Sequence, residues 1–420
     1  MPARPLSLAL IVMGAVAFIL FVAVLAPRSL AIAPPLIGIL IYSLWPFFGQ
    51  GSRPALKNTA SVLAFGVVAL SALSAFWALN PGESLERAFK LMVVLVPGAL
   101  FFTVCAATPV TEKDSKCLWF WLPALFIAAC LFMMSEYMTD YFVYRLIRGI
   151  PADEGVAIAV MNRSSVILSM VFLPVLALVW VGASTHLQGA LQKIFPCLVV
   201  ISLLFLLFFT ESQSSQMAVL LGLSVFLLFP VENKWAMRGL FVLICAGILG
   251  APFLCRTVFE IFTPLYDAGS DYGWVQRANI MPRLEVWNSV STYILTHPFL
   301  GSGIEATRSV PAFETQEIFQ PGRTLLHPHN AVLQIWMEFG VVGAMMSCIL
   351  FGLLLRSIHR MAANPAGKAT ARLALGLLAA VGGVGVVGYG LWQGWWLGLL
   401  ILCAGMAVFC IHIIQILQNR

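Results

Sequence analysis

Long runs of apolar residues alternate with polar breaks along the whole chain. A helix that crosses a bilayer needs roughly 20 consecutive apolar residues, and such runs recur about twelve times here. The predicted spans are residues 6–26, 31–48, 58–79, 90–107, 117–134, 157–182, 195–209, 215–230, 236–254, 330–355, 371–390 and 393–417. The pattern therefore predicts an all-α polytopic membrane protein with about 12 transmembrane helices.

The polar breaks divide the predicted membrane domain into three parts. Spans one to nine occupy residues 1–254 and include a small outer loop at 135–156. Residues 255–329 form a large loop that we expect to carry short amphipathic helices, and residues 330–420 hold the last three spans. The composition agrees with this, because 60% of the residues are hydrophobic, which is more than a soluble core requires, and only 10% are charged. We expect one integral-membrane domain.

Lysine and arginine positions predict the orientation of the spans. If the N-terminus lies inside, the breaks that contain Lys57, Lys116, Lys193, Lys234 and Lys368 all face the cytoplasm. This distribution follows the positive-inside rule. Both termini are then cytoplasmic, and the two long loops face outward, which means the periplasm in a Gram-negative cell.

The large outer loop uses arginine selectively. It contains five arginines and no lysine, namely Arg256, Arg277, Arg283, Arg308 and Arg323. Both residue types satisfy bulk electrostatics, but only arginine offers a planar fork that matches phosphate or carboxylate. The same loop holds seven carboxylates, so some of these arginines are open to a purely structural pairing.

Within this loop, Met281–Pro298 has the pattern of an amphipathic helix at the outer interface. Arg283 lies one turn above Trp287 on this helix. Gly301-Ser302-Gly303 follows, and its backbone N–H groups are candidates for contact with an anion. A helix that only anchors the loop at the surface is an equally open interpretation.

Two shorter polar segments lie at the outer ends of predicted spans. Thr210–Gln216, which includes Ser212 and Gln213, has seven consecutive polar residues between two apolar runs. Hydrogen bonds to a sugar or phosphate would explain them, and so in part would helix capping. Asn162–Ser165 is similar, and its Arg163 either reaches the interface or faces a polar cavity.

The segment His327–Gly343 concentrates polar groups at the mouth of an apolar helix. If the helix begins near Asn330, then Asn330, Gln334 and Glu338 form a polar stripe at i, i+4 and i+8. A histidine before the helix suits a general base, because its ordinary pKa lies near neutrality. A His-x-His metal site is the alternative, but no third ligand is recognisable. We expect no cofactor and no bound metal.

These motifs together resemble the O-antigen ligase/polymerase superfamily. The resemblance rests on Arg283-x-x-x-Trp287, on Thr296–Gly303, on His327–Gly343 and on the polar turn Thr210–Gln216, within a twelve-span layout. It implies a fold like that of the type C glycosyltransferases, in the bacterial inner membrane, with the active site facing the periplasm. The activity implied is metal-independent, inverting transfer of a polysaccharide from undecaprenyl pyrophosphate to a sugar hydroxyl of lipid A–core. One departure is Ser212-Gln213, where many relatives have Ser-Arg.

The resemblance also implies roles for individual residues. His329 is expected to be the base, and Arg283 to neutralise the pyrophosphate. The other residues expected to bind substrate are Arg163, Arg145, Arg148, His327, Asn330, Glu338, Gln213, Ser212, Gly301, Gly303 and Trp287. The expected partners are the lipid-linked O-polysaccharide, lipid A–core and the bilayer, with no nucleic acid; the oligomeric state stays open.

Three functions compete on these residues. The first is the O-antigen ligase. The second is an O-antigen polymerase or a protein O-oligosaccharyltransferase, which would share the chemistry but use another acceptor. The third is a transporter for lipid-linked sugar, in which arginines only bind pyrophosphate in transit. A transporter should have its charged site near the membrane midplane, whereas these arginines lie in outer loops.

Overall fold

The computed structural model describes residues 7–269, 280–311, 313 and 325–418. These residues form helices joined by turns, and they contain no strand. The α-helices are α1 (Leu8–Leu25), α2 (Ala33–Leu44), α3 (Thr59–Leu73), α4 (Pro81–Ala107), α5 (Glu112–Met138), α6 (Phe142–Arg148), α7 (Asn162–His186), α8 (Leu191–Phe209), α9 (Gln213–Leu228), α10 (Lys234–Gly269), α12 (Ile280–Ile294), α14 (Ala331–Ala362), α15 (Pro365–Val387) and α16 (Gly394–Gln418). The 3-10 helices are η1 (Pro27–Ala31), η2 (Trp45–Phe48), η3 (Ser74–Phe76), η4 (Ile158–Met161) and η5 (Ala306–Ser309).

The predicted all-α polytopic fold is confirmed. Among the described residues, 10 helices are long and apolar enough to cross a membrane. Two further apolar helices, Ala33–Phe48 and Gln213–Leu228, are shorter. Each of the predicted spans overlaps one of these helices. The number of complete membrane crossings therefore lies between 10, if neither short helix crosses, and 12, if both do.

Helix α7 forms the centre of the molecule. Its residues from Ser164 to Val179 are all buried, and it packs against α5, α8, α9 and α16. A helix that is apolar on every face is stable only when other apolar surfaces surround it. The first residues of α7 are therefore held rigidly at one end of the bundle.

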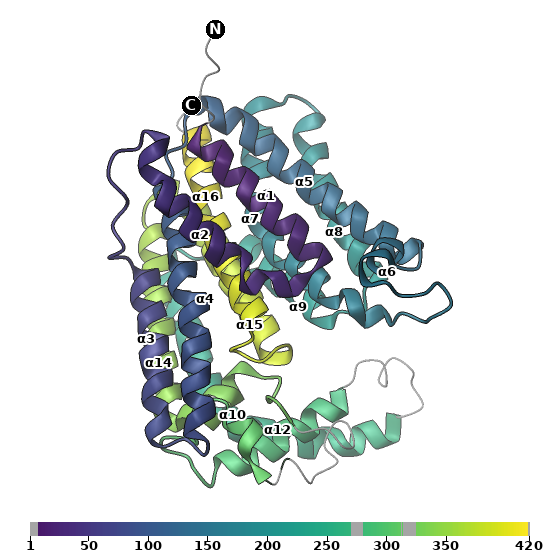
Figure 1. Cartoon of the computed structure of the whole chain (residues 1–420), viewed down its shortest axis with the longest axis vertical. Coiled ribbons are helices and arrows are strands. Elements are labelled where there is room, and N and C mark those ends of the chain that lie inside the picture. The colour runs from purple at the N-terminus through teal and green to yellow at the C-terminus, as the bar shows by residue number, and fades with distance from the viewer. Residues whose placement is uncertain (1–6, 270–279, 312, 314–324, 419–420) are drawn as a thin grey trace.

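The loop between the ninth and tenth predicted spans differs from the prediction. The predicted span ended at residue 254, but helix α10 continues to Gly269. Apolar residues recur at helical spacing around Arg256 and Glu260, so the helix goes on past the predicted end. Pro252 and Pro264 lie within it. Helix α12 packs against α10 and α14. Figure 1 shows α12 lying across the lower end of the upright helices.

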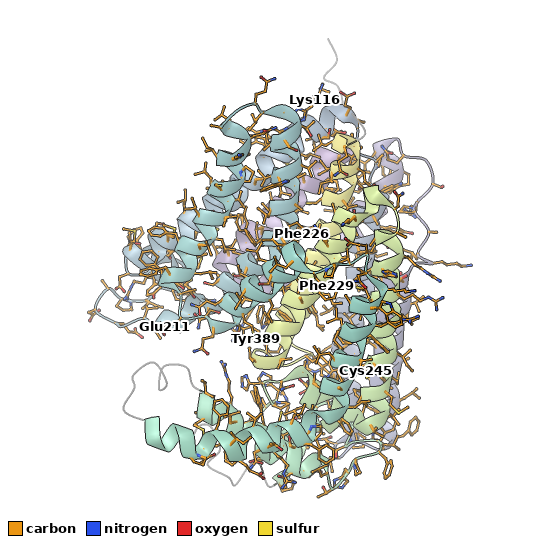
Figure 2. All side chains as sticks on the ribbon, turned by 180° about the vertical axis from the view of Figure 1, so that it is seen from behind. Lys116, Glu211, Phe226, Phe229, Cys245 and Tyr389 are labelled. Atoms are coloured by element: carbon orange, nitrogen blue, oxygen red, sulfur yellow. The ribbon has the colours of Figure 1, made fainter. Side chains whose placement is uncertain are left out.

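The two ends of the bundle differ in what they carry. Helix α1 begins and helix α16 ends at the upper end (Figure 1), and Lys116 lies at that end as well (Figure 2). Glu211 and Tyr389 lie farther down, beside the arm formed by α12 and part of α10 (Figure 2). The polar segments singled out from the sequence gather at this lower position.

Candidate active site

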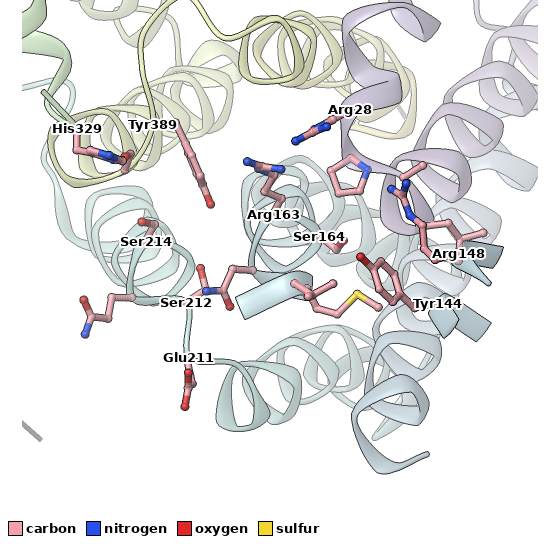
Figure 3. A pocket seen from close by; sticks show the side chains of 18 of the residues that line it. Arg28, Tyr144, Arg148, Arg163, Ser164, Glu211, Ser212, Ser214, His329 and Tyr389 are labelled. Carbon is pink, nitrogen blue, oxygen red and sulfur yellow. The ribbon is translucent and has the colours of Figure 1, made fainter. Parts of the chain in front are cut away.

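A cavity of about 700 Å³ lies where helices α7 and α9 begin. Its walls come from segments far apart in the sequence: the end of α1, α6, the starts of α7 and α9, α12, and the residues before α14 and α16. Four arginines line it, namely Arg28, Arg148, Arg163 and Arg283. We call it the arginine pocket. Figure 3 shows Arg28, Arg163 and Arg148 on one side and His329 and Tyr389 on another.

The charge of these arginines is not neutralised within the described part of the chain. None of the four forms a salt bridge with a described carboxylate. Arg163 lies over the ring of Trp395, with its Cζ atom 5.6 Å from the ring centroid. Arg283 donates to Oε1 of Gln213 at 3.5 Å, which is the outer limit for a hydrogen bond. Since Glu211 is the one carboxylate among the lining residues, the pocket is strongly cationic.

Helix ends add to this positive potential. Helices α7, α9 and α14 all begin at or beside the pocket. The side chain of Ser212 caps α9 by accepting from the backbone N–H of Ser215. A helix N-terminus carries about half an elementary positive charge and favours bound phosphate or carboxylate. Arginine forks and helix ends together suit a polyanionic ligand.

His329 lines this pocket in an unusual backbone conformation. Its φ angle is 53°, a left-handed value that is rare for residues other than glycine. Its ring Nδ1 donates to the carbonyl of Gly388 at 2.8 Å, so the neutral ring carries its lone pair on Nε2. Burial, followed by the nearby charge of Arg283, lowers the pKa of His329. The imidazole is therefore neutral near pH 7 and able to accept a proton.

His327 lies against the ring of His329 and bonds to Gln393. Its ring centroid is 4.2 Å from that of His329. The amide of Gln393 donates to Nε2 of His327 at 3.0 Å, and Oε1 of the same amide accepts from Nε1 of Trp395 at 2.8 Å. Burial lowers the pKa of His327 to about 3, which keeps it a neutral acceptor. His327 thus links the segment before α14 to the loop before α16.

Helix α12 connects the pocket to the histidine segment. Arg283 lines the pocket, and Trp287, one turn further along, donates from Nε1 to the carbonyl of Pro328 at 3.0 Å. Val286, Val290 and Ile294 bury the helix in an apolar cluster. Trp287 therefore holds the backbone beside His329 in place through this hydrogen bond.

The glycine-rich segment after α12 makes different contacts from those expected. The backbone N–H groups of Ser302 and Gly303 donate to the carbonyls of Met337 and Glu338 at 2.9 Å. The N–H groups of Ser302 and Gly303 are thus used inside the fold, and the anion contact expected of Gly301 and Gly303 stays a prediction that the bond at Gly303 does not favour. Helix α14 breaks at Gly340, where φ is 58°. A Cβ there would lie 2.3 Å from the carbonyl oxygen of Phe299, so only glycine permits this close approach.

Glu338 and Asn330 also hold the fold together. Glu338 is fully buried, and its carboxylate accepts from Gln334, from the backbone of Glu305 and from Nε1 of Trp392. Asn330 caps α14 by accepting from two backbone N–H groups. The predicted helix start at Asn330 is confirmed. Both side chains are committed to protein partners, so their expected contacts with substrate are not supported by the geometry.

Arg145 has a similar structural role. Its guanidinium donates to the carboxylate and carbonyl of Asp140 and to the carbonyls of Pro151 and Glu154, at 2.6 to 2.8 Å. These bonds close the small outer loop. Arg145 is therefore occupied, whereas Arg148, one turn along α6, lines the pocket. Arg277 and Arg323 lie outside the described residues.

Arg28 and Tyr389 are among the pocket residues that the sequence analysis missed. Arg28, in η1 between the first two helices, faces the pocket beside Arg163 (Figure 3). Tyr389 points its hydroxyl into the pocket between His329 and Arg163 (Figure 3). Burial raises the pKa of Tyr389 to about 12, so it remains a hydroxyl donor. The position of Arg28 in the break between the first two predicted spans was the available signal for it.

The fold and pocket define a polytopic helical membrane protein with a cationic site at one end of its helices. Residues 198–348 match the sequence model of the family described as "O-Antigen ligase". A Rickettsia conorii protein named "Putative polysaccharide ligase" is 23% identical over 84% of this chain and 81% of its own length. The Rickettsia typhi protein of that name is 23% identical over 86% and 84%, respectively.

The family match covers the arginine pocket only in part. Ser212, Gln213, Arg283 and His329 lie within residues 198–348, whereas Arg163 lies before them. The relatives extend the similarity over most of the chain. The chain is therefore similar to O-antigen ligases over residues 198–348 and to polysaccharide ligases over most of its length.

Proposed function

We propose that the protein is an O-antigen ligase of the inner membrane. In this function it transfers a polysaccharide from undecaprenyl pyrophosphate to a sugar hydroxyl of lipid A–core at the periplasmic face. The superfamily supports a glycosyltransferase-type enzyme with a polysaccharide substrate. The observation that carries the proposal is that one pocket holds four arginines without carboxylate partners among the described residues together with His329, whose Nδ1 bonds to the carbonyl of Gly388.

The arginine pocket suits the leaving group of this reaction. A pyrophosphate carries several negative charges, and its charge grows as the bond to the anomeric carbon breaks. Fixed guanidinium groups stabilise such charge without reorganisation, and their planar forks match phosphate oxygens. Arg283 and Arg163 are the proposed clamp, with Arg148 and Arg28 completing it. In this proposal these arginines take the place of the arginine that the resemblance led us to expect at the position of Gln213.

His329 supplies the proton acceptor in the proposed reaction. The acceptor hydroxyl oxygen forms a bond to the anomeric carbon, and the bond from that carbon to the pyrophosphate oxygen breaks. The hydroxyl proton moves to Nε2 of His329, while undecaprenyl pyrophosphate leaves with the bonding electrons. The Nδ1–H bond to Gly388 keeps the ring in the correct tautomer. Attack opposite to the leaving group inverts the anomeric configuration.

Transfer by the purified protein tests this function. The protein in detergent is incubated with undecaprenyl-pyrophosphate-linked glycan and lipid A–core, without ATP or added metal, and products are identified by mass spectrometry. A lipid A–core–glycan conjugate supports the ligase. Elongated lipid-linked glycan alone would identify a polymerase, and transfer only to a Ser/Thr peptide would identify a protein glycosyltransferase. No product from folded protein would overturn all three enzymatic functions and favour a transporter.

A further inference from the structure

A second cavity, of about 720 Å³, lies toward the opposite end of the same helices. It is formed by the later parts of α7, α9 and α16 and by the first turns of α8 and α15. Phe226, one of its lining residues, lies nearer than Tyr389 to the end that carries Lys116 (Figure 2). We call it the basal cavity. It shares no lining residue with the arginine pocket.

The walls of the basal cavity are mostly apolar and partly exposed at the protein surface. Val200, Phe226 and Leu373 are among the residues that line it. Trp180, Ile201 and Leu227 also line it and are more than half exposed at the surface. Water gains few hydrogen bonds in an apolar space of this kind. A hydrocarbon chain from the surrounding bilayer is the natural occupant.

Two cations lie at the edge of this apolar space. Lys368 and Arg372 are one helical turn apart on α15, and both line the cavity. Lys368 pairs with Glu232 at 2.5 Å. The Nε atom of Arg372 is buried, and no described group accepts a hydrogen bond from it. A buried N–H without an acceptor is costly. An oxygen of a phosphate would satisfy it through a charge-assisted hydrogen bond.

We propose that the basal cavity binds one anionic membrane phospholipid, with its phosphate on Arg372 and Lys368 and an acyl chain along Phe226 and Trp180. Two cations against the single carboxylate of Glu232 leave a net positive charge for the headgroup. Basic pockets between transmembrane helices on the cytoplasmic side bind such headgroups. The positive-inside distribution of lysines assigns this end to the cytoplasmic leaflet. The proposed site is thus separate from the polysaccharide chemistry.

Native mass spectrometry of the purified full chain tests this site. The probes are phosphatidylglycerol, zwitterionic phosphatidylcholine and inorganic phosphate, each added to delipidated protein in detergent. We expect one phosphatidylglycerol per chain and weaker binding of the other two. Arg372→Gln should lower phosphatidylglycerol affinity about fivefold, the effect of one cation near a membrane surface. Arg238→Gln removes a cation outside the cavity lining and is the matched control.

Cysteine reactivity gives a second measurement that does not depend on a variant folding. Cys197 lines the basal cavity and is exposed. Phosphatidylglycerol should slow the alkylation of Cys197 in the wild-type protein, measured by peptide mass spectrometry. When phosphatidylcholine is added instead, Cys197 should be alkylated as fast as without lipid. Equal protection by phosphatidylcholine, protection by inorganic phosphate alone, or equal losses in Arg372→Gln and Arg238→Gln would each overturn the proposal.

Discussion

The arginine pocket and the basal cavity have nearly equal volumes, about 700 and 720 Å³, yet opposite chemistry. Both use helices α7 and α9, one at their first residues and the other at their last turns. At the arginine pocket, helix N-termini and several guanidinium groups converge on a polar space. At the basal cavity, two cations edge an apolar wall. The difference suggests that the first is built for a polyanion and the second for a lipid with one phosphate.

The largest effect expected from this comparison is at His329. Its replacement in His329→Ala removes the proposed base, and general base catalysis contributes roughly 100- to 10,000-fold. Transfer should fall by that factor in single-turnover assays, while donor affinity changes little. His359→Ala is the matched control, because His359 also bonds a backbone carbonyl through Nδ1 but lies near the far end of α14. Substantial turnover by His329→Ala would show that another group accepts the proton.

A smaller effect is expected when an arginine keeps its charge but loses its planar fork. Arg283→Lys should lower kcat/KM for the donor roughly 10- to 100-fold, since a hydrogen bond between charged groups contributes about 1.5–3 kcal/mol. Arg372→Lys makes the same change in the basal cavity and should leave transfer unaffected. Normal activity of Arg283→Lys would mean that the pyrophosphate is not held by a bidentate contact from this residue.

Much of the fold followed from hydrophobic periodicity. Each apolar run became a helix, because a single segment in lipid satisfies its own backbone hydrogen bonds only as a helix. The start of α14 at Asn330 was also predictable, since an asparagine before an apolar run is a strong N-cap. The end of α10 was not predictable in the same way, because its amphipathic extension resembles a loop with charged residues.

The candidate site was less predictable because its contacts join distant segments. Arg283 and His329 stood out from local motifs, but Tyr389 lies in a short break between two spans with no motif of its own. Tyr389 lies in the pocket because its segment is joined to the histidines, by the bond from Nδ1 of His329 to Gly388 and by the contact between Gln393 and His327. Likewise, no local pattern separates Arg145, whose donors close a loop, from Arg148 in the pocket.

The pH dependence of transfer should reflect the burial of His329. A base must be unprotonated, so activity should be flat near neutrality and fall as the pH drops below the lowered pKa of His329, about tenfold per pH unit. Because the charge of Arg283 contributes to lowering this pKa, the acid limb of Arg283→Gln should move to higher pH. A decline that begins above about pH 6.5, the ordinary pKa of histidine, would contradict a lowered pKa at the base.

The smallest effect is expected at Gln213, where the resemblance noted from the sequence led us to expect arginine. Its contact with Arg283 spans 3.5 Å, and so weak a bond contributes at most about 0.5 kcal/mol, or roughly twofold in rate. Gln213→Ala should therefore stay within about threefold of wild type in kcat/KM. Gln192→Ala, at an exposed amide that donates to the carbonyl of Ser184 at 3.1 Å, is the control from the opposite end of the bundle. A loss greater than about tenfold at Gln213 alone would mean that this amide binds the donor directly.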